Sequence, residues 1–114
     1  MSARKAARLL EEAESDLLHG NYDKSASASY FAARMAAELF LRSKNLDIPR
    51  RDDKLANLLE NQGYALLAGS LRKLYDVRKK ADYSGELVTR EEAARSLDRA
   101  SEIVRRLLHT DRRY

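Results

Sequence analysis

The chain has 114 residues, 35% of them charged, with a formal net charge of +4 and no cysteine. Its length predicts one domain over residues 1–114, and the absence of cysteine excludes disulfides, thiolate metal sites and cysteine nucleophiles. No apolar run approaches the roughly 20 residues of a membrane span, and acidic residues stand where a signal peptide would be apolar, so we expect a cytoplasmic protein whose basic charge favours an acidic partner such as RNA.

The first half of the chain predicts two helices. Ser2 can cap a first helix whose apolar residues recur at three- and four-residue spacing, and the Gly-Asn pair at 20–21 ends it. A second helix starts near residue 22 or 23 and runs to about 45. It is apolar almost all the way round, so we expect it at the centre of a bundle or in a dimer interface. Its polar stripe consists of Arg34, Glu38 and Arg42.

The second half predicts three more helices. The connection NLDIPRRDD at 45–53 holds the only proline and is a loop. A short helix covers about 53–61 and a longer one about 64–82. The sequence Thr-Arg-Glu-Glu at 89–92 is a capping box for a last helix that runs to about 109. No strand alternation is present, so we expect an all-α fold, an antiparallel up-and-down helical bundle of four long helices plus one short helix.

Catalytic signals are few. His19 and His109 each stand at the end of a predicted helix, where an imidazole meets the helix dipole favourably, and this structural explanation suffices for both. Metal-binding and phosphate-loop motifs are missing, so we expect no metal site and no cofactor. The stripe of Arg34, Glu38 and Arg42 is an exposed salt-bridge ladder, a buried network or a phosphate site.

Arg78 occupies an unexpected position on the fourth predicted helix. At roughly 100° per residue it projects within about 20° of Leu67, near the middle of an apolar stripe. An unpaired guanidinium is costly to desolvate there. Either Arg78 is buried and paired with a carboxylate such as Glu38, or it lies on the floor of a cleft and binds phosphate. In the second case Asp82 and Tyr83, one turn further on, lie beside it.

Two segments carry a resemblance to a known family. Residues 26–46, ASASYFAARMAAELFLRSKNL, form an alanine-rich helix with a tyrosine near its start. Residues 77–100, VRKKADYSGELVTREEAARSLDRA, give an arginine, then Ala-Asp-Tyr, a short loop and a helix. Together they resemble the HEPN domain family, particularly its small stand-alone prokaryotic members. The resemblance covers the order of helices in nearly all of the chain.

The resemblance implies an up-and-down helical bundle, usually a homodimer, whose two polar motifs face a shared cleft. Many HEPN proteins are metal-independent ribonucleases, often toxins encoded beside a small nucleotidyltransferase that acts as antitoxin, while others bind nucleotides or serve as scaffolds. The ribonuclease motif is an arginine, four to six residues, then a histidine. Arg78 matches its first position, but Tyr83, preceded by Asp82, stands at the second. Relatives also often carry a His-Lys pair where this chain has Asp53 and Lys54.

The leading hypothesis is a HEPN homodimer that binds nucleotide or RNA through Arg78, Arg34 and Glu38, in a toxin–antitoxin or related system with a nucleotidyltransferase partner. Tyr83 is then a candidate acceptor of a transferred nucleotide. One alternative is a non-catalytic interaction module in which Arg78 only fixes the packing. Another is a metal-independent ribonuclease in which Arg78 acts with Asp82 and Tyr83 as the catalytic residues. A further class is an RNA-binding dimer that uses the arginine-rich last helix.

Overall fold

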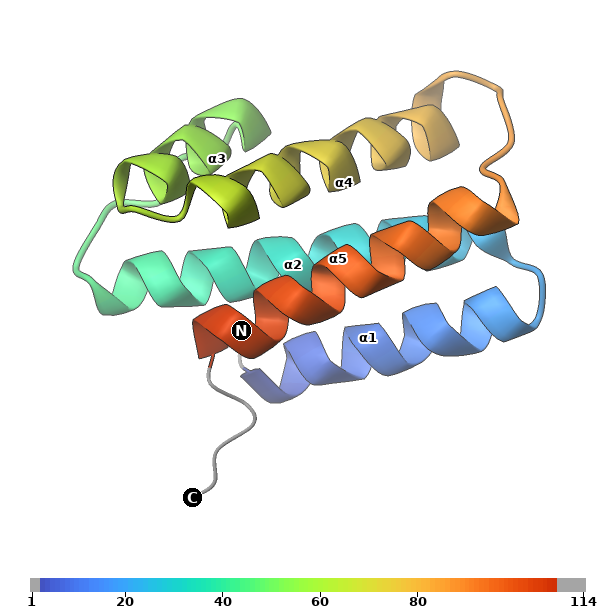
Figure 1. Cartoon of the computed structure of the whole chain (residues 1–114), viewed down its shortest axis with the longest axis horizontal. Coiled ribbons are helices and arrows are strands. Elements are labelled where there is room, and N and C mark those ends of the chain that lie inside the picture. Colours follow the sequence, from blue (N-terminus) through green and yellow to red (C-terminus); the bar gives the residue numbers. More distant parts are fainter. Residues whose placement is uncertain (1–2, 109–114) are drawn as a thin grey trace.

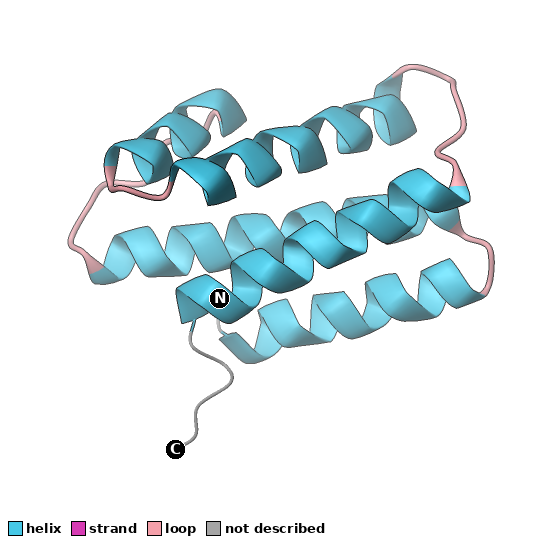
Figure 2. Ribbon diagram, in the orientation of Figure 1, coloured by secondary structure: helices cyan, strands magenta, loops and turns pink. Residues whose placement is uncertain are grey.

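The computed structural model describes residues 3–108, and all of the regular structure in this range is helical. The prediction of an all-α fold is therefore confirmed. Consecutive helices α1 and α2 run in opposite directions, as do α4 and α5 (Figures 1 and 2). Within the described range, no helix is both long enough and apolar enough to cross a membrane. The helices are α1 (Ala3–Leu18), α2 (Tyr22–Ser43), α3 (Asp52–Asn61), α4 (Ala65–Tyr83) and α5 (Arg90–Leu108).

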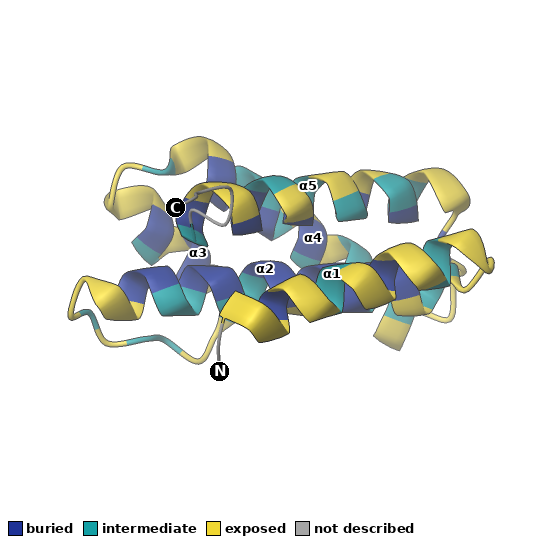
Figure 3. Ribbon diagram, turned by 90° about the horizontal axis from the view of Figure 1, so that it is seen from below, coloured by how far each residue is buried: buried dark blue, intermediate teal, exposed yellow. Residues whose placement is uncertain are grey.

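Helix α2 lies at the centre of the fold and packs against each of the other four helices. Small side chains make this possible, because they let neighbouring helices approach closely on several sides at once. Four alanines of α2 are completely buried, and Figure 3 shows the buried faces of the helices turned inward. The prediction that this helix is central to the bundle is confirmed. The four alanines are Ala32, Ala33, Ala36 and Ala37.

Helix boundaries differ from the sequence prediction by one or two residues. Helix α2 ends at Ser43 rather than near residue 45, because Asn45 adopts a left-handed backbone with φ of 63° and the amide of Leu46 bonds back to the carbonyl of Leu41. Helix α4 continues one residue further than predicted, through Tyr83. The cap predicted at Ser2 lies outside the described residues, as do residues 109–114.

The corner between α4 and α5 is held by the predicted capping box. Thr89 Oγ1 accepts the amide of Glu92 at 3.1 Å, and Glu92 Oε1 accepts the amide of Thr89 at 2.9 Å. Glu92 also binds Lys80 Nζ at 2.9 Å, which ties α5 to α4. The amide of Val88 donates to Asp23 Oδ1 at 3.0 Å, which ties the corner to α2. These bonds fix where the last turn of α4 lies.

Replacing Glu92 with glutamine is expected to lower stability at pH 7 and to matter less as the pH falls below the ordinary glutamate pKa of 4.5. Glutamine keeps the cap but loses the charge that pairs with Lys80. Hydrogen bonds from the Thr89 amide and from Lys80 hold the pKa of Glu92 below its ordinary 4.5. The carboxylate therefore stabilises the fold above its unfolded-state pKa, and this contribution is lost as the pH falls through the lowered folded-state pKa. Thermal unfolding of both proteins across this range measures the difference, and a Tm gap that stays constant would contradict the assignment.

Candidate functional site

Arg78 lies on the inner side of α4, where it faces the aromatic rings of α2. Its side chain is only 20% exposed. The guanidinium carbon lies 4.9 Å from the ring centre of Phe31, 5.1 Å from that of Tyr30 and 5.9 Å from that of Tyr83. Aromatic faces carry negative charge density and attract a cation, so the three rings replace part of the lost hydration. This arrangement explains how a guanidinium can occupy an apolar stripe.

Within residues 3–108, Asp82 forms an ion pair with the part-buried guanidinium of Arg78. Arg78 Nε lies 3.2 Å from Asp82 Oδ2, one turn further along α4. The geometry is that of an ion pair without a hydrogen bond, because Nε is buried and has no hydrogen-bond partner. The two Nη groups are not buried, and they donate no hydrogen bond within residues 3–108. The two Nη groups of Arg78 are therefore available to donate hydrogen bonds to a ligand.

The predicted pairing of Arg78 with Glu38 is wrong. Arg78 lies level with Tyr30 and Phe31 on α2, whereas Glu38 stands about two turns further along that helix. Glu38 instead accepts a hydrogen bond from Arg34 Nε at 2.6 Å. The sequence-predicted site residues therefore fall into two groups, with Arg78 in one and the pair of Arg34 and Glu38 in the other.

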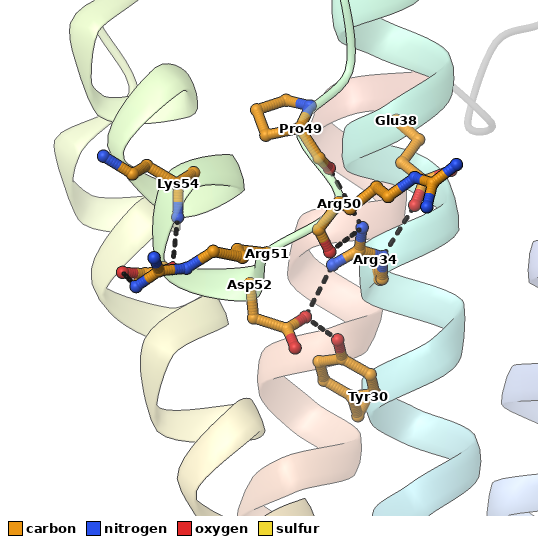
Figure 4. Close-up of polar contacts among 9 residues, drawn as sticks. Tyr30, Arg34, Glu38, Pro49, Arg50, Arg51, Asp52 and Lys54 are labelled. Carbon is orange, nitrogen blue, oxygen red and sulfur yellow. Dashed lines mark hydrogen bonds and ion pairs between the residues drawn. The ribbon is translucent and has the colours of Figure 1, made fainter.

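Arg34 holds the connection between α2 and α3 (Figure 4). Besides Glu38, it binds Asp52 Oδ1 through Nη1 at 2.6 Å and the carbonyls of Pro49 and Arg50 through Nη2 at 3.2 and 3.1 Å. Arg34 and Glu38 are only 17% and 14% exposed. Arg34 and Glu38 thus belong to a part-buried network rather than to an exposed ladder, and the phosphate site stays a prediction.

Tyr30 connects the two groups. Its hydroxyl donates to Asp52, the same carboxylate that Arg34 binds (Figure 4). Its ring lies 5.1 Å from the guanidinium carbon of Arg78. Tyr30 is 2% exposed. Burial raises the pKa of the Asp52 carboxyl, and the positive charge of Arg78 opposes that rise. Tyr30 and Asp52 were not predicted as site residues. The tyrosine near the start of an alanine-rich helix was their only signal, because nothing local in the sequence places Asp52 beside it.

Asp53 and Lys54, which stand where relatives often have a His-Lys pair, make no hydrogen bond or ion pair with Arg78 in the described part of the chain. Asp53 accepts two hydrogen bonds from Arg51, at 3.1 and 2.8 Å, and one from the amide of Lys54 at 2.9 Å. The hydrogen bonds from Arg51 lower the pKa of the Asp53 carboxyl. These contacts lie at the start of α3, and none of them involves Arg78.

Two hollows flank the residues around Arg78. Phe31 and Asp82 line a groove of about 370 Å³ that α1 and α2 border. Tyr30 and Asp52 line a second hollow of about 270 Å³ on the α3 and α4 side. Tyr83 is 72% exposed and Phe31 43% exposed, which is high for large aromatic residues. The Nη groups of Arg78 thus lie beside two exposed aromatic side chains, Phe31 and Tyr83.

Two other features singled out from the sequence, His19 and the arginines of the last helix, make local contacts in the structure. His19 Nδ1 lies 2.7 Å from the carbonyl of Ser15 at the end of α1, as the structural explanation predicts. On α5, Arg105 and Arg106 both bind Glu102, whose pKa they lower. These two pairs reduce the charge that the last helix offers to RNA. His109 lies outside the described residues.

The comparison with known families agrees with the resemblance noted from the sequence. The family model of the HEPN domain matches residues 1–110. The chain belongs to the HEPN family. The matched range includes Arg78 and the side chains around it, Tyr30, Phe31, Asp82 and Tyr83. HEPN membership is consistent with a function related to nucleotides or RNA. No curated protein is detectably similar to this HEPN chain in sequence.

Replacing Tyr30 with phenylalanine is expected to destabilise the fold by about 1–2 kcal/mol, because it removes a buried hydrogen bond to a charged acceptor and leaves the ring in place. Urea denaturation measures the change. Tyr75→Phe is the matched control, since the Tyr75 ring packs on Tyr30 but its hydroxyl makes no hydrogen bond within the described residues. Equal losses in the two variants would show that the Tyr30 hydroxyl does not hold Asp52.

Proposed function

We propose that this HEPN protein binds a nucleotide or RNA at Arg78, with the two Nη groups of the guanidinium contacting phosphate. The observation that carries the proposal is the free Nη edge of a cation that is otherwise enclosed by Tyr30, Phe31 and Tyr83. A planar fork of donors matches two phosphate oxygens, and the low local dielectric strengthens the contact.

The exposed rings suit the rest of such a ligand. Nucleobases stack on aromatic side chains, and this stacking contributes about 1–3 kcal/mol per base with little sequence preference. Phe31 and Tyr83 present accessible ring surface within 6 Å of the guanidinium carbon. A ligand that carries both a phosphate and a base therefore engages Arg78 and a ring together, whereas inorganic phosphate engages Arg78 alone.

The proposal includes a homodimer and a nucleotidyltransferase partner. Two large aromatic side chains exposed beside a half-buried cation form a surface that a second copy can cover, and this copy would bring a second Arg78 to the same cleft. Tyr83 is the candidate acceptor of a transferred nucleotide, because it is the exposed hydroxyl next to the phosphate-binding group. Both points rest on the HEPN resemblance and on these exposures.

Two other functions keep specific support. A metal-independent ribonuclease would use Arg78 with Asp82 and Tyr83, which lie beside it at 3.2 Å and 5.9 Å. The residues that the structure places around Arg78 include no histidine, so general acid–base catalysis would fall to a carboxylate or a phenol. A non-catalytic interaction module is supported by the packing role of Arg34 and Glu38.

The deciding experiment compares Arg78→Ala with Lys73→Ala in binding single-stranded RNA and adenosine monophosphate. Lys73 lies exposed on the same helix, so its variant removes an equal charge without touching the site. Arg78→Ala is expected to weaken binding by about tenfold or more, and Lys73→Ala by less than about twofold. Arg78→Lys should fall between the wild type and Arg78→Ala because it keeps the charge but loses the fork.

The same samples, incubated with RNA in EDTA, separate the alternatives. Cleavage that is lost in Arg78→Ala would indicate the ribonuclease. Equal binding by all variants that have wild-type circular dichroism, or no binding by the wild type, would contradict the proposal and favour the interaction module. Sedimentation equilibrium on the wild type tests the dimer, for which twice the chain mass is expected.

A further inference from the structure

Asp82 stands where a carboxylate does not help its own helix. It is the second-last residue of α4, which ends at Tyr83. The carboxyl end of a helix carries partial negative charge, so an acidic side chain in the last turn is unfavourable and a basic one is favourable. The stability of α4 therefore gives no reason for an aspartate at this position.

A hydrogen bond from another helix holds Asp82 in place. Ser27 Oγ of α2 donates to Asp82 Oδ1 at 3.3 Å, while Asp82 Oδ2 lies 3.2 Å from Arg78 Nε. The carboxylate is 34% exposed, so it touches solvent as well as the guanidinium. Asp82 consequently stays within reach of Arg78 without the hydrogen bond that would lock the two side chains together.

We infer that Asp82 is an internal counter-ion that competes with anionic ligands for Arg78 and so sets the affinity of the site. This inference rests on the proposed function, because it concerns the same guanidinium. The carboxylate occupies the Nε side and leaves the Nη edge open, so phosphate can bind but must do so beside a fixed negative charge. The repulsion between the two anions lowers the affinity for every phosphate.

A nucleotide can overcome this repulsion better than a phosphate ion can, because it makes additional contacts. A bare phosphate ion gains only the Nη contacts and opposes Asp82, whereas a nucleotide also stacks on Phe31 or Tyr83. Asp82 thereby weakens the binding of inorganic phosphate and nucleotides alike, and stacking on a ring supplies the preference for ligands that carry a base.

The test is isothermal titration of the full chain with adenosine monophosphate and, separately, with inorganic phosphate. Asp82→Asn removes the charge and keeps the shape. Asp76→Asn is the matched control, because Asp76 lies on the same helix, is 72% exposed and pairs with Lys79 instead. Asp82→Asn is expected to bind both ligands about five- to tenfold more tightly, and Asp76→Asn within about twofold of the wild type. Adding Arg78→Ala to Asp82→Asn should abolish the gain.

The inference is overturned if the wild type binds the ligands and Asp82→Asn binds them no more tightly, or more weakly. Asp82 would then orient Arg78 or contact the ligand, and the proposed function would stand. A gain that requires Arg78 but shows no preference for adenosine monophosphate over phosphate supports the inference and contradicts the proposed function. Failure of every variant to bind either ligand overturns both. Thermal unfolding checks that each variant is folded. Asp82→Asn is expected to stay folded, because it removes a negative charge from the carboxyl end of α4.

Discussion

The partial burial of one guanidinium between α2 and α4 is the constraint on which the rest of the site depends. Arg78 loses much of its hydration, and a buried donor without a hydrogen bond costs about 1–3 kcal/mol. Three aromatic rings within 6 Å return about 0.5–2 kcal/mol each, and the ion pair with Asp82 adds little net stability. The three rings together contribute about 1.5–6 kcal/mol, which matches or exceeds the cost of the one unpaired donor. The rings therefore explain how the fold tolerates Arg78, and the open Nη edge is what supports the proposed ligand role.

Tyr30 also connects Arg78 to the start of α3. Its ring faces Arg78, and its hydroxyl binds the carboxylate that Arg34 holds at the start of α3. Arg34 in turn binds the carbonyls of Pro49 and Arg50, so the proline-containing connection is fixed to α2. A side chain on α4 and a loop before α3 are thus linked through one tyrosine of the central helix.

Local rules of the sequence predicted the parts of this arrangement that depend on one helix at a time. Helical periodicity placed Arg78 on the inner face of α4, and the Thr89 to Glu92 spacing gave the capping box. The alanine-rich segment gave a central helix, as observed for α2.

The sequence did not predict which residues of different helices contact one another. The relative register of α2 and α4 decides whether Arg78 meets Tyr30 or Glu38, and no local signal specifies that register. Asp52 reaches Tyr30 only because the connection after α2 folds back along it. A single left-handed residue, Asn45, ended α2 earlier than periodicity indicated.

The most direct test of the central claim is an NMR titration that follows the Arg78 Nε–Hε signal as adenosine monophosphate is added. The buried Nε should exchange slowly enough with water for this signal to be observed, and Arg78→Lys assigns it by its absence. The account predicts a saturable shift of the Arg78 signal, while the signal of Arg51, which pairs with Asp53 on an exposed surface, stays in place. Saturable binding that leaves the Arg78 signal unmoved would contradict the account.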